Sequence, residues 1–306
     1  MSQAGLRSLA RSATPFAVRN PGRQSNSMAY LERPHFRAFG EDHQMRETGE
    51  DSVLIEYHAA VAVITLNEPK SLNALSAGIK AGLESALPNV LSSREVRAIV
   101  ITGAGEAFCA GGDLRAMDDR TPAAALARMG RNHRWLIPLL TAGKPIVSAV
   151  NGFAVGAGFS LALTGDVVVA SENALFKAGF PRIGLAPDLG LAYTLPRAVG
   201  LNQARDILLT NRDVGAEEAL RLGIATRLCA RGSLIETALS IASNLSAGPA
   251  FAYGLTKQLL RRTFDGPLEA FLEAEAAAQA LAFGSKDFAE GVEAFASKRK
   301  PVFTGE

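Results

Sequence analysis

Two glycine-rich stretches decide the fold of this chain: Cys109-Ala110-Gly111-Gly112-Asp113-Leu114 and Asn151-Gly152-Phe153-Ala154-Val155-Gly156-Ala157-Gly158. Each follows an apolar segment with a strand-like pattern and leads towards a helical one. Small residues at such a turn allow a ligand to approach the backbone N–H groups, where the helix dipole also favours negative charge. Two turns directed at one oxygen would form an oxyanion hole. By composition alone, the same glycines also fit tight packing of a strand against a helix, with no ligand.

Outside these turns, strand and helix patterns alternate along the chain. Short apolar, β-branched runs predict strands at residues 53–57, 61–66, 97–102, 146–150 and 166–170. Helices are predicted after Ser76, which suits an N-cap, and over residues 121–141 and 157–163. This alternation indicates an α/β core. Residues 145–165 carry no charge and are long enough to cross a bilayer, but the Asn151-Gly152 turn divides them, so we reject a membrane span.

The composition excludes several classes of function. The 306 residues carry 32 Lys and Arg against 30 Asp and Glu, a net charge of +2, and no Lys/Arg run dense enough to bind nucleic acid. Two cysteines, Cys109 and Cys229, give no disulfide framework, and the four scattered histidines show no metal-ligand spacing. We therefore expect a soluble, cytoplasmic globular protein that needs no metal.

Composition also divides the chain into three regions. Residues 1–50 form an N-terminal extension with arginines and no acid through Leu31, which resembles an organellar presequence or a disordered tail; we favour the tail, and organellar import stays open. Residues 51–200 are the predicted core, and residues 201–306 are predicted to be helical. Apolar stripes in the last region suit capping of the core or contact with another subunit. These stripes are Leu234, Ala238, Ile241 and Leu245, and Phe288, Val292 and Phe295.

Three segments, in order along the chain, resemble the enoyl-CoA hydratase/isomerase (crotonase) superfamily. They are residues 108–114 (Phe-Cys-Ala-Gly-Gly-Asp-Leu), 144–152 (Lys-Pro-Ile-Val-Ser-Ala-Val-Asn-Gly) and 295–303 (Phe-Ala-Ser-Lys-Arg-Lys-Pro-Val-Phe). The resemblance implies an α/β fold with a ClpP/crotonase-like ββα spiral core and a C-terminal helical trimerisation region. It also implies assembly as a homotrimer or as a hexamer built from two trimers.

The same resemblance implies an acyl-CoA substrate whose thioester oxygen is held by the backbone N–H groups of Gly112 and Ala157. CoA enters as part of the substrate, and no separate cofactor is implied. Arg115 would lie near the CoA phosphates or adenine, and Asp113 would cap the helix after the hole. The positions expected to contact CoA are Ser71, Asn73 and Ala74 of the family's nucleotide loop, and Ala110, Gly111, Asp113, Leu114 and Arg115.

Departures from the family pattern narrow the reaction. Enoyl-CoA hydratases use two glutamates, and this chain has Ser160 and Phe180 at those positions, which makes ordinary hydration unfavoured. Asp188 lies in a Pro-Asp-x-Gly turn similar to that of the double-bond isomerases, including the 1,2-epoxyphenylacetyl-CoA isomerase branch. A lone aspartate before a helix is otherwise typical of an N-cap. We favour an enoyl-CoA isomerase of fatty or aromatic acid degradation with Asp188 as its base, with the pKa of Asp188 raised by apolar neighbours such as Phe180.

Two alternatives stay open. His133 shares a predicted helix face with Met129, Leu136, Ile137 and Leu140 and is therefore expected to point inward, as a core histidine or as a base. Its position resembles that of the base in aryl-CoA hydrolytic dehalogenases, in which Asp188 would be the nucleophile. A catalytically silent acyl-CoA binder is the third hypothesis.

Overall fold

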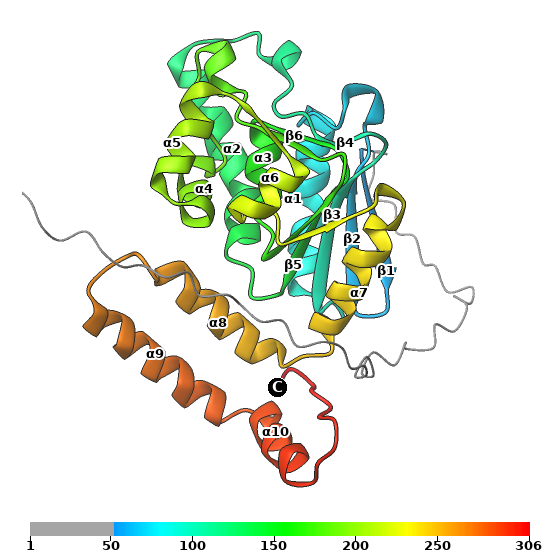
Figure 1. Cartoon of the computed structure of the whole chain (residues 1–306), viewed down its shortest axis with the longest axis vertical. Coiled ribbons are helices and arrows are strands. Elements are labelled where there is room, and N and C mark those ends of the chain that lie inside the picture. The colour runs from blue at the N-terminus through cyan, green and yellow to red at the C-terminus, as the bar shows by residue number, and fades with distance from the viewer. Residues whose placement is uncertain (1–51) are drawn as a thin grey trace, which may run out of the picture. The chain divides into compact units, whose positions relative to one another are not determined.

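The structure is a computed structural model of the 306-residue chain and describes residues 52–306 (Figure 1). The predicted N-terminal extension lies outside the described residues. The first elements are β1 (Val53–His58), β2 (Val61–Leu66), η1 (Pro69–Ser71), α1 (Ala77–Ser92), β3 (Ala98–Gly103), β4 (Ala107–Cys109), η2 (Leu114–Ala116) and α2 (Pro122–Leu140). They continue with β5 (Ile146–Val150), β6 (Phe153–Val155), α3 (Ala157–Ala162), β7 (Val167–Ser171), β8 (Leu175–Lys177), η3 (Phe180–Ile183), α4 (Leu191–Val199) and α5 (Leu201–Thr210).

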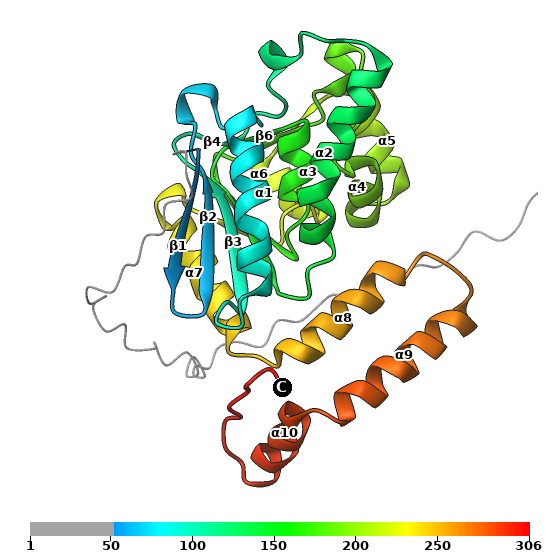
Figure 2. The same cartoon turned by 180° about the vertical axis from the view of Figure 1, so that it is seen from behind.

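The main sheet has six strands in the order β1-β2-β3-β5-β7-β10, where β10 is Arg227–Cys229. Only β1 is antiparallel to its neighbour, as the short connection to β2 predicts. Because helices cover both faces, the central strands are apolar on both sides. Val61 and Val63 of β2 pack in a cluster with α7 (Leu234–Ser246). The alternate residues Ala62 and Ile64 belong to the cluster on the other face, where α1 lies (Figures 1 and 2).

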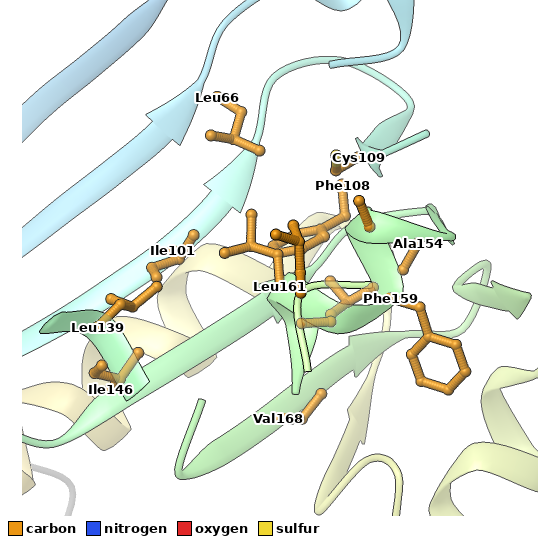
Figure 3. Close-up of a cluster of buried hydrophobic side chains, with 14 of the residues drawn as sticks. Leu66, Ile101, Phe108, Cys109, Leu139, Ile146, Ala154, Phe159, Leu161 and Val168 are labelled. Atoms are coloured by element: carbon orange, nitrogen blue, oxygen red, sulfur yellow. The ribbon is translucent and has the colours of Figure 1, made fainter. Parts of the chain in front are cut away.

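A second sheet of four short strands carries the glycine turns. Its order is β4-β6-β8-β9, where β9 is Asp213–Gly215, and it places β4 parallel to β6. The main core fills the space between the two sheets and the helices. Figure 3 shows Ile101 of β3, Ile146 of β5, Leu139 of α2 and Phe159 and Leu161 of α3 in one buried cluster. The short helix that begins at the second turn is therefore anchored in the core.

The region after residue 200 contains more than helices, because β9 and β10 complete the two sheets. Its remaining elements are α6 (Ala216–Leu222), η4 (Arg231–Ser233), α8 (Ala250–Arg262), α9 (Leu268–Phe283) and α10 (Lys286–Ala296). Leu234 and Ala238 of the predicted stripe on α7 are buried against the main sheet. By contrast, Phe288, Val292 and Phe295 of α10 are exposed. No helix among residues 52–306 is long and apolar enough to cross a membrane.

Candidate active site

The two glycine turns are packed against each other at the ends of β4 and β6. A Cβ added to Gly158 would lie 2.0 Å from the carbonyl oxygen of Cys109, so only glycine fits there. Gly111 has a φ of +100°, and a Cβ on it would lie 2.7 Å from Val155 O and 3.6 Å from Ala157 N. A side chain at Gly111 would therefore be both strained and crowded. This packing brings the second turn's Ala157 amide close to the first turn.

The amides of Gly112 and Ala157, the two expected donors, differ in their surroundings. Ala157 is the first residue of α3, so its N–H has no acceptor within the helix. Gly112 is only partly buried and forms an isolated parallel bridge with Leu75. Within residues 52–306, neither amide donates a backbone hydrogen bond outside regular secondary structure. The geometry is compatible with an oxyanion hole, and also explains why glycine recurs on both sides of it.

The loop expected to lie along the nucleotide is held by Asn73. Its side chain is fully buried, accepts from Glu68 N at 2.9 Å and donates to the carbonyls of Ala104 and Ala107 at 2.9 and 2.8 Å. These bonds stabilise the positive φ of 55° at Asn73. The side chain is thus engaged within the protein, and a ligand would meet the backbone of this loop. Ala74 is buried as well.

Beside the first turn, Asp113 is the cap that the sequence predicts. Its Oδ1 accepts a hydrogen bond from the backbone N–H of Arg115 at 3.1 Å, so Asp113 is the N-cap of η2. The Arg115 side chain is 81% exposed and lies 3.4 Å from the same oxygen. An exposed pair of this kind adds little stability and leaves the guanidinium accessible. Leu114 is half exposed, and Ala110 N donates to Leu72 O at 2.9 Å, which joins this turn to the nucleotide loop.

Asp188 is not an N-cap. The cap of α4 is Gly190, and it makes no side-chain capping bond. Asp188 Oδ1 is buried and has no hydrogen-bond partner among the described residues. Burial raises the pKa of the Asp188 carboxyl, while the charge of Lys80, the backbone amide of Asp188 and His133 each lower it in part. A partly buried carboxylate with one oxygen left without a partner suits a base better than a structural cap.

Ser160 connects the turn that carries Asp188 to the second glycine turn. Its hydroxyl is fully buried, donates to Asp188 O at 2.9 Å and lies 3.3 Å from Gly156 O. Phe180 is also buried, and its ring lies 3.8 Å from where a Cβ of Gly156 would be. Both residues at the positions of the hydratase glutamates therefore have structural contacts here.

The inward orientation predicted for His133 is wrong. The buried face of α2 consists of Asn132, Trp135, Leu136 and Leu139, and His133 is exposed. The expected buried face of α2 was displaced by about one residue because Ile137 was included in it. In the structure, Ile137 is 54% exposed. His133 is nevertheless close enough for its charge to lower the pKa of Asp188. His133 is therefore an exposed residue within electrostatic range of Asp188 and is not a core histidine.

Lys80 is the residue near the site that sequence analysis missed. It lies in the first turns of α1, and its charge interacts with both Asp113 and Asp188. Nothing in the pattern of α1 marks it, because a lone lysine at the start of an amphipathic helix normally faces solvent. The bridge between Leu75 and Gly112 brings the start of α1 to the first turn. This bridge is a tertiary contact, so the local sequence around Lys80 does not reveal it.

Two further observations concern Cys109 and the side chains that could ligate a metal. Cys109 is fully buried, and burial raises the pKa of its thiol to about 12, so its thiolate is not accessible as a nucleophile. Within residues 52–306, no three His, Cys, Asp or Glu side chains are grouped so as to hold a metal ion. The candidate site therefore combines the two turn amides with the carboxyl group of Asp188, whose pKa the charges of Lys80 and His133 lower in part.

Comparison with known proteins identifies the family. The profile of the family Enoyl-CoA hydratase/isomerase matches residues 56–306. The chain is 37% identical over 258 residues to the 1,2-epoxyphenylacetyl-CoA isomerase of Escherichia coli K12, covering 83% of this chain and 98% of that protein. It is 40% identical, with the same coverage of both, to a protein of Rhodobacter capsulatus named probable enoyl-CoA hydratase.

Solved structures agree with this result. The crystal structure of an enoyl-CoA hydratase/isomerase from Cupriavidus metallidurans is similar with a TM-score of 0.80 and 35% identity, covering 85% of this chain and 98% of that one. A further structure, an enoyl-CoA hydratase subunit from Geobacillus kaustophilus, has a TM-score of 0.79 at 34% identity, covering 83% of this chain and 98% of that one. The chain belongs to the enoyl-CoA hydratase/isomerase (crotonase) family of acyl-CoA enzymes, and its two sheets and C-terminal helices form the crotonase fold.

Proposed function

We propose that this chain is an enoyl-CoA double-bond isomerase in which Asp188 moves one proton along the acyl chain. The single observation that carries the proposal is the environment of the Asp188 carboxyl group. Its Oδ1 is buried without a partner, and its main chain is bonded to α3, the helix that begins at the proposed donor Ala157. A carboxylate in such surroundings is a stronger base than one in water.

In the proposed reaction, the Asp188 carboxylate takes a proton from one carbon of the enoyl chain. The electron pair of that C–H bond moves into the conjugated system, and negative charge develops on the thioester oxygen. The N–H groups of Gly112 and Ala157 hold that oxygen, and each donor is typically worth about 3–4 kcal/mol in the transition state. The Asp188 carboxylic acid then returns the proton to the carbon two positions away. No atom is gained or lost.

Hydration is less well supported, although relatives of this chain bear both names. Adding water across a double bond requires one group to activate the water and another to protonate carbon. Ser160, at one of the two glutamate positions, donates its only hydroxyl proton within the protein, and Phe180, at the other, has no proton to transfer. The site thus has one carboxyl group for a reaction that needs one.

A second candidate is an aryl-CoA hydrolytic dehalogenase. The observation in its favour is that His133 is near enough for its charge to act on Asp188. In that reaction the Asp188 carboxylate would displace halide from the ring, and water activated by His133 would hydrolyse the resulting ester. A silent acyl-CoA binder would use the same oxyanion hole without proton transfer.

We also propose that the protein acts as a homotrimer or hexamer in the cytoplasm on acyl-CoA substrates, with CoA contacting the 71–74 loop and the first glycine turn. The exposed apolar residues of α9 and α10, among them Phe283 and Phe295, at 62% and 87% exposed, support burial in an assembly. Light scattering of the purified protein tests this; a monomer at micromolar concentration would contradict it.

The reaction is tested by NMR in D2O with a small panel of enoyl-CoA and aryl-CoA esters, including a haloaryl thioester. An isomerase incorporates deuterium at the carbons it protonates and shifts the double bond. Water addition would identify a hydratase, and halide release without a migrating double bond would identify the dehalogenase. Binding without exchange into any ester would leave only the silent binder.

A further inference from the structure

The helix that carries Lys80, α1, begins beside the first glycine turn. Leu75 N donates to Gly111 O at 2.7 Å, and Leu75 forms the parallel bridge with Gly112. Ser76 then caps α1 by accepting from Ile79 N at 3.1 Å. Lys80 follows directly and is partly buried. Its place is therefore determined by the same turn that carries the first donor.

Asp188 is anchored to the second donor in a corresponding way. Its carbonyl accepts from the hydroxyl of Ser160, three residues into α3 after Ala157. Lys80 and Asp188 are thus attached to opposite turns of one site. Their charges interact: the charge of Asp188 raises the pKa of Lys80, and the charge of Lys80 lowers the pKa of Asp188.

The contact between α1 and α2 leaves the Lys80 ammonium group without an ion-pair partner. One turn further along α1, Glu84 pairs with Arg134 of α2 at 3.4 Å. At the level of Lys80, by contrast, the charges on α2 that act on Lys80 are those of Arg131 and Arg128, which have the same sign. Within residues 52–306 Lys80 forms no ion pair at all, unlike several other lysines of the chain. Those that do are Lys177, Lys257 and Lys286.

Two carboxylates are close enough to interact with Lys80, and they differ in what surrounds them. Asp113 already lies 3.4 Å from the guanidinium of Arg115 and caps η2. Asp188 has a buried oxygen with no hydrogen-bond partner. Burial favours the protonated form of Asp188, but a proton acceptor must be ionised. A nearby positive charge opposes the effect of burial.

Resting on the function proposed above, we propose that Lys80 is a positioning residue that keeps Asp188 ionised and ready to accept a proton. It acts through space rather than by direct pairing. His133 on α2 adds to the same effect, and Arg128 and Arg131 add positive charge around Lys80. Burial and these two arginines lower the pKa of Lys80, and Asp113 and Asp188 raise it.

The test is the pH profile of kcat/KM for Lys80→Met. The acid limb of this profile reports the ionisation of the base in the free enzyme. Removing the cation raises the pKa of Asp188, so the limb moves to higher pH by roughly one unit, and activity below the limb falls about tenfold. Lys80→Arg keeps the charge and restores the wild-type limb. Arg134→Met, which removes a cation from the same helix contact one turn away, leaves the limb in place.

Three outcomes overturn the inference: an unshifted limb in Lys80→Met, a uniform loss at every pH, or a limb shifted equally by Arg134→Met. Thermal unfolding of each variant identifies a loss of folding. The proposed function fails separately: if Asp188→Asn retains turnover, Asp188 is not the base. If Asp188→Asn is inactive while Lys80→Met keeps the wild-type limb, Asp188 remains the base and only the role of Lys80 is refuted.

Discussion

Replacing Ser160 by alanine should separate the stability of the fold from the alignment of the site. The Ser160 hydroxyl is fully buried and donates to Asp188 O at 2.9 Å. Asp188 O also accepts a hydrogen bond from Leu191 N at 3.1 Å, and Gly156 O accepts one from the Ser160 amide at 3.1 Å. Neither carbonyl is therefore left unpaired in Ser160→Ala. Loss of one neutral hydrogen bond without an orphaned partner should lower the free energy of unfolding by about 1 kcal/mol.

The effect of Ser160→Ala on catalysis should be larger. This bond ties the turn that carries the proposed base to the helix that begins at a proposed donor. Since a misplacement of about 1 Å at a reacting centre reduces the rate by roughly 100-fold, we expect kcat to fall between about 10- and 100-fold. KM should change only a few-fold, because the groups proposed to bind CoA are untouched.

The control is Thr164→Val, in the turn that directly follows α3. Thr164 is buried, and its hydroxyl donates to Leu161 O at 2.8 Å, so the variant loses a comparable hydrogen bond that does not reach Asp188. Urea unfolding and steady-state isomerisation are measured for both variants. The reasoning is refuted if Ser160→Ala and Thr164→Val lose similar stability and both keep wild-type kcat.

Three further predictions concern the same site. Asp188→Asn should lower kcat at least about 100-fold in the isomerisation assay, with CoA-ester affinity by calorimetry within a few-fold of wild type; near-normal turnover would contradict the assignment. Because the pKa of Asp188 is raised on folding, its ionisation disfavours the folded state above that pKa. Asp188→Asn should therefore raise Tm in neutral buffer, and the gain should shrink as pH falls through the folded pKa; an equal gain at every pH would point to packing instead. Gly158→Ala should destabilise the protein and abolish activity, since its Cβ would lie 2.0 Å from Cys109 O. The control Gly130→Ala, on α2 with no atom within 4 Å, should stabilise the protein by about 0.5–1 kcal/mol in urea unfolding.

The long strands and main helices could be predicted because burial on both faces leaves continuous apolar runs. Residues 61–66 and 146–150 were predicted as strands with the bounds the structure has. The short strands β8 and β9 could not, because three residues carry too little pattern. Long-range pairing defines them: Phe176 of β8 pairs with Ala154 of β6 on one side and with Val214 of β9 on the other.

The candidate site shows the same division. The turns around Gly112 and Ala157 are visible in the sequence because close approach of two backbones demands glycine. The orientation of His133 was misjudged because an apolar residue, Ile137, is exposed and shifted the expected face. No local sequence pattern indicates the position of Lys80 or the hydrogen bond from Ser160 to Asp188 O. Lys80 and Ser160 become site residues through contacts between segments that are far apart along the chain.

The proposed base faces two opposing requirements that explain why a cation should be near it but not bonded to it. Burial makes the Asp188 carboxylate a stronger base but reduces the fraction that is ionised. A direct ion pair would restore ionisation, yet it would also occupy the carboxylate oxygen that must reach the substrate and weaken it as a base. Lys80 interacts with Asp188 without forming an ion pair, so it can favour the charged form while leaving Oδ1 free. A cation that acts on Asp188 without pairing with it therefore keeps the carboxylate ionised and leaves it free to accept a proton, whereas a paired cation only keeps it ionised.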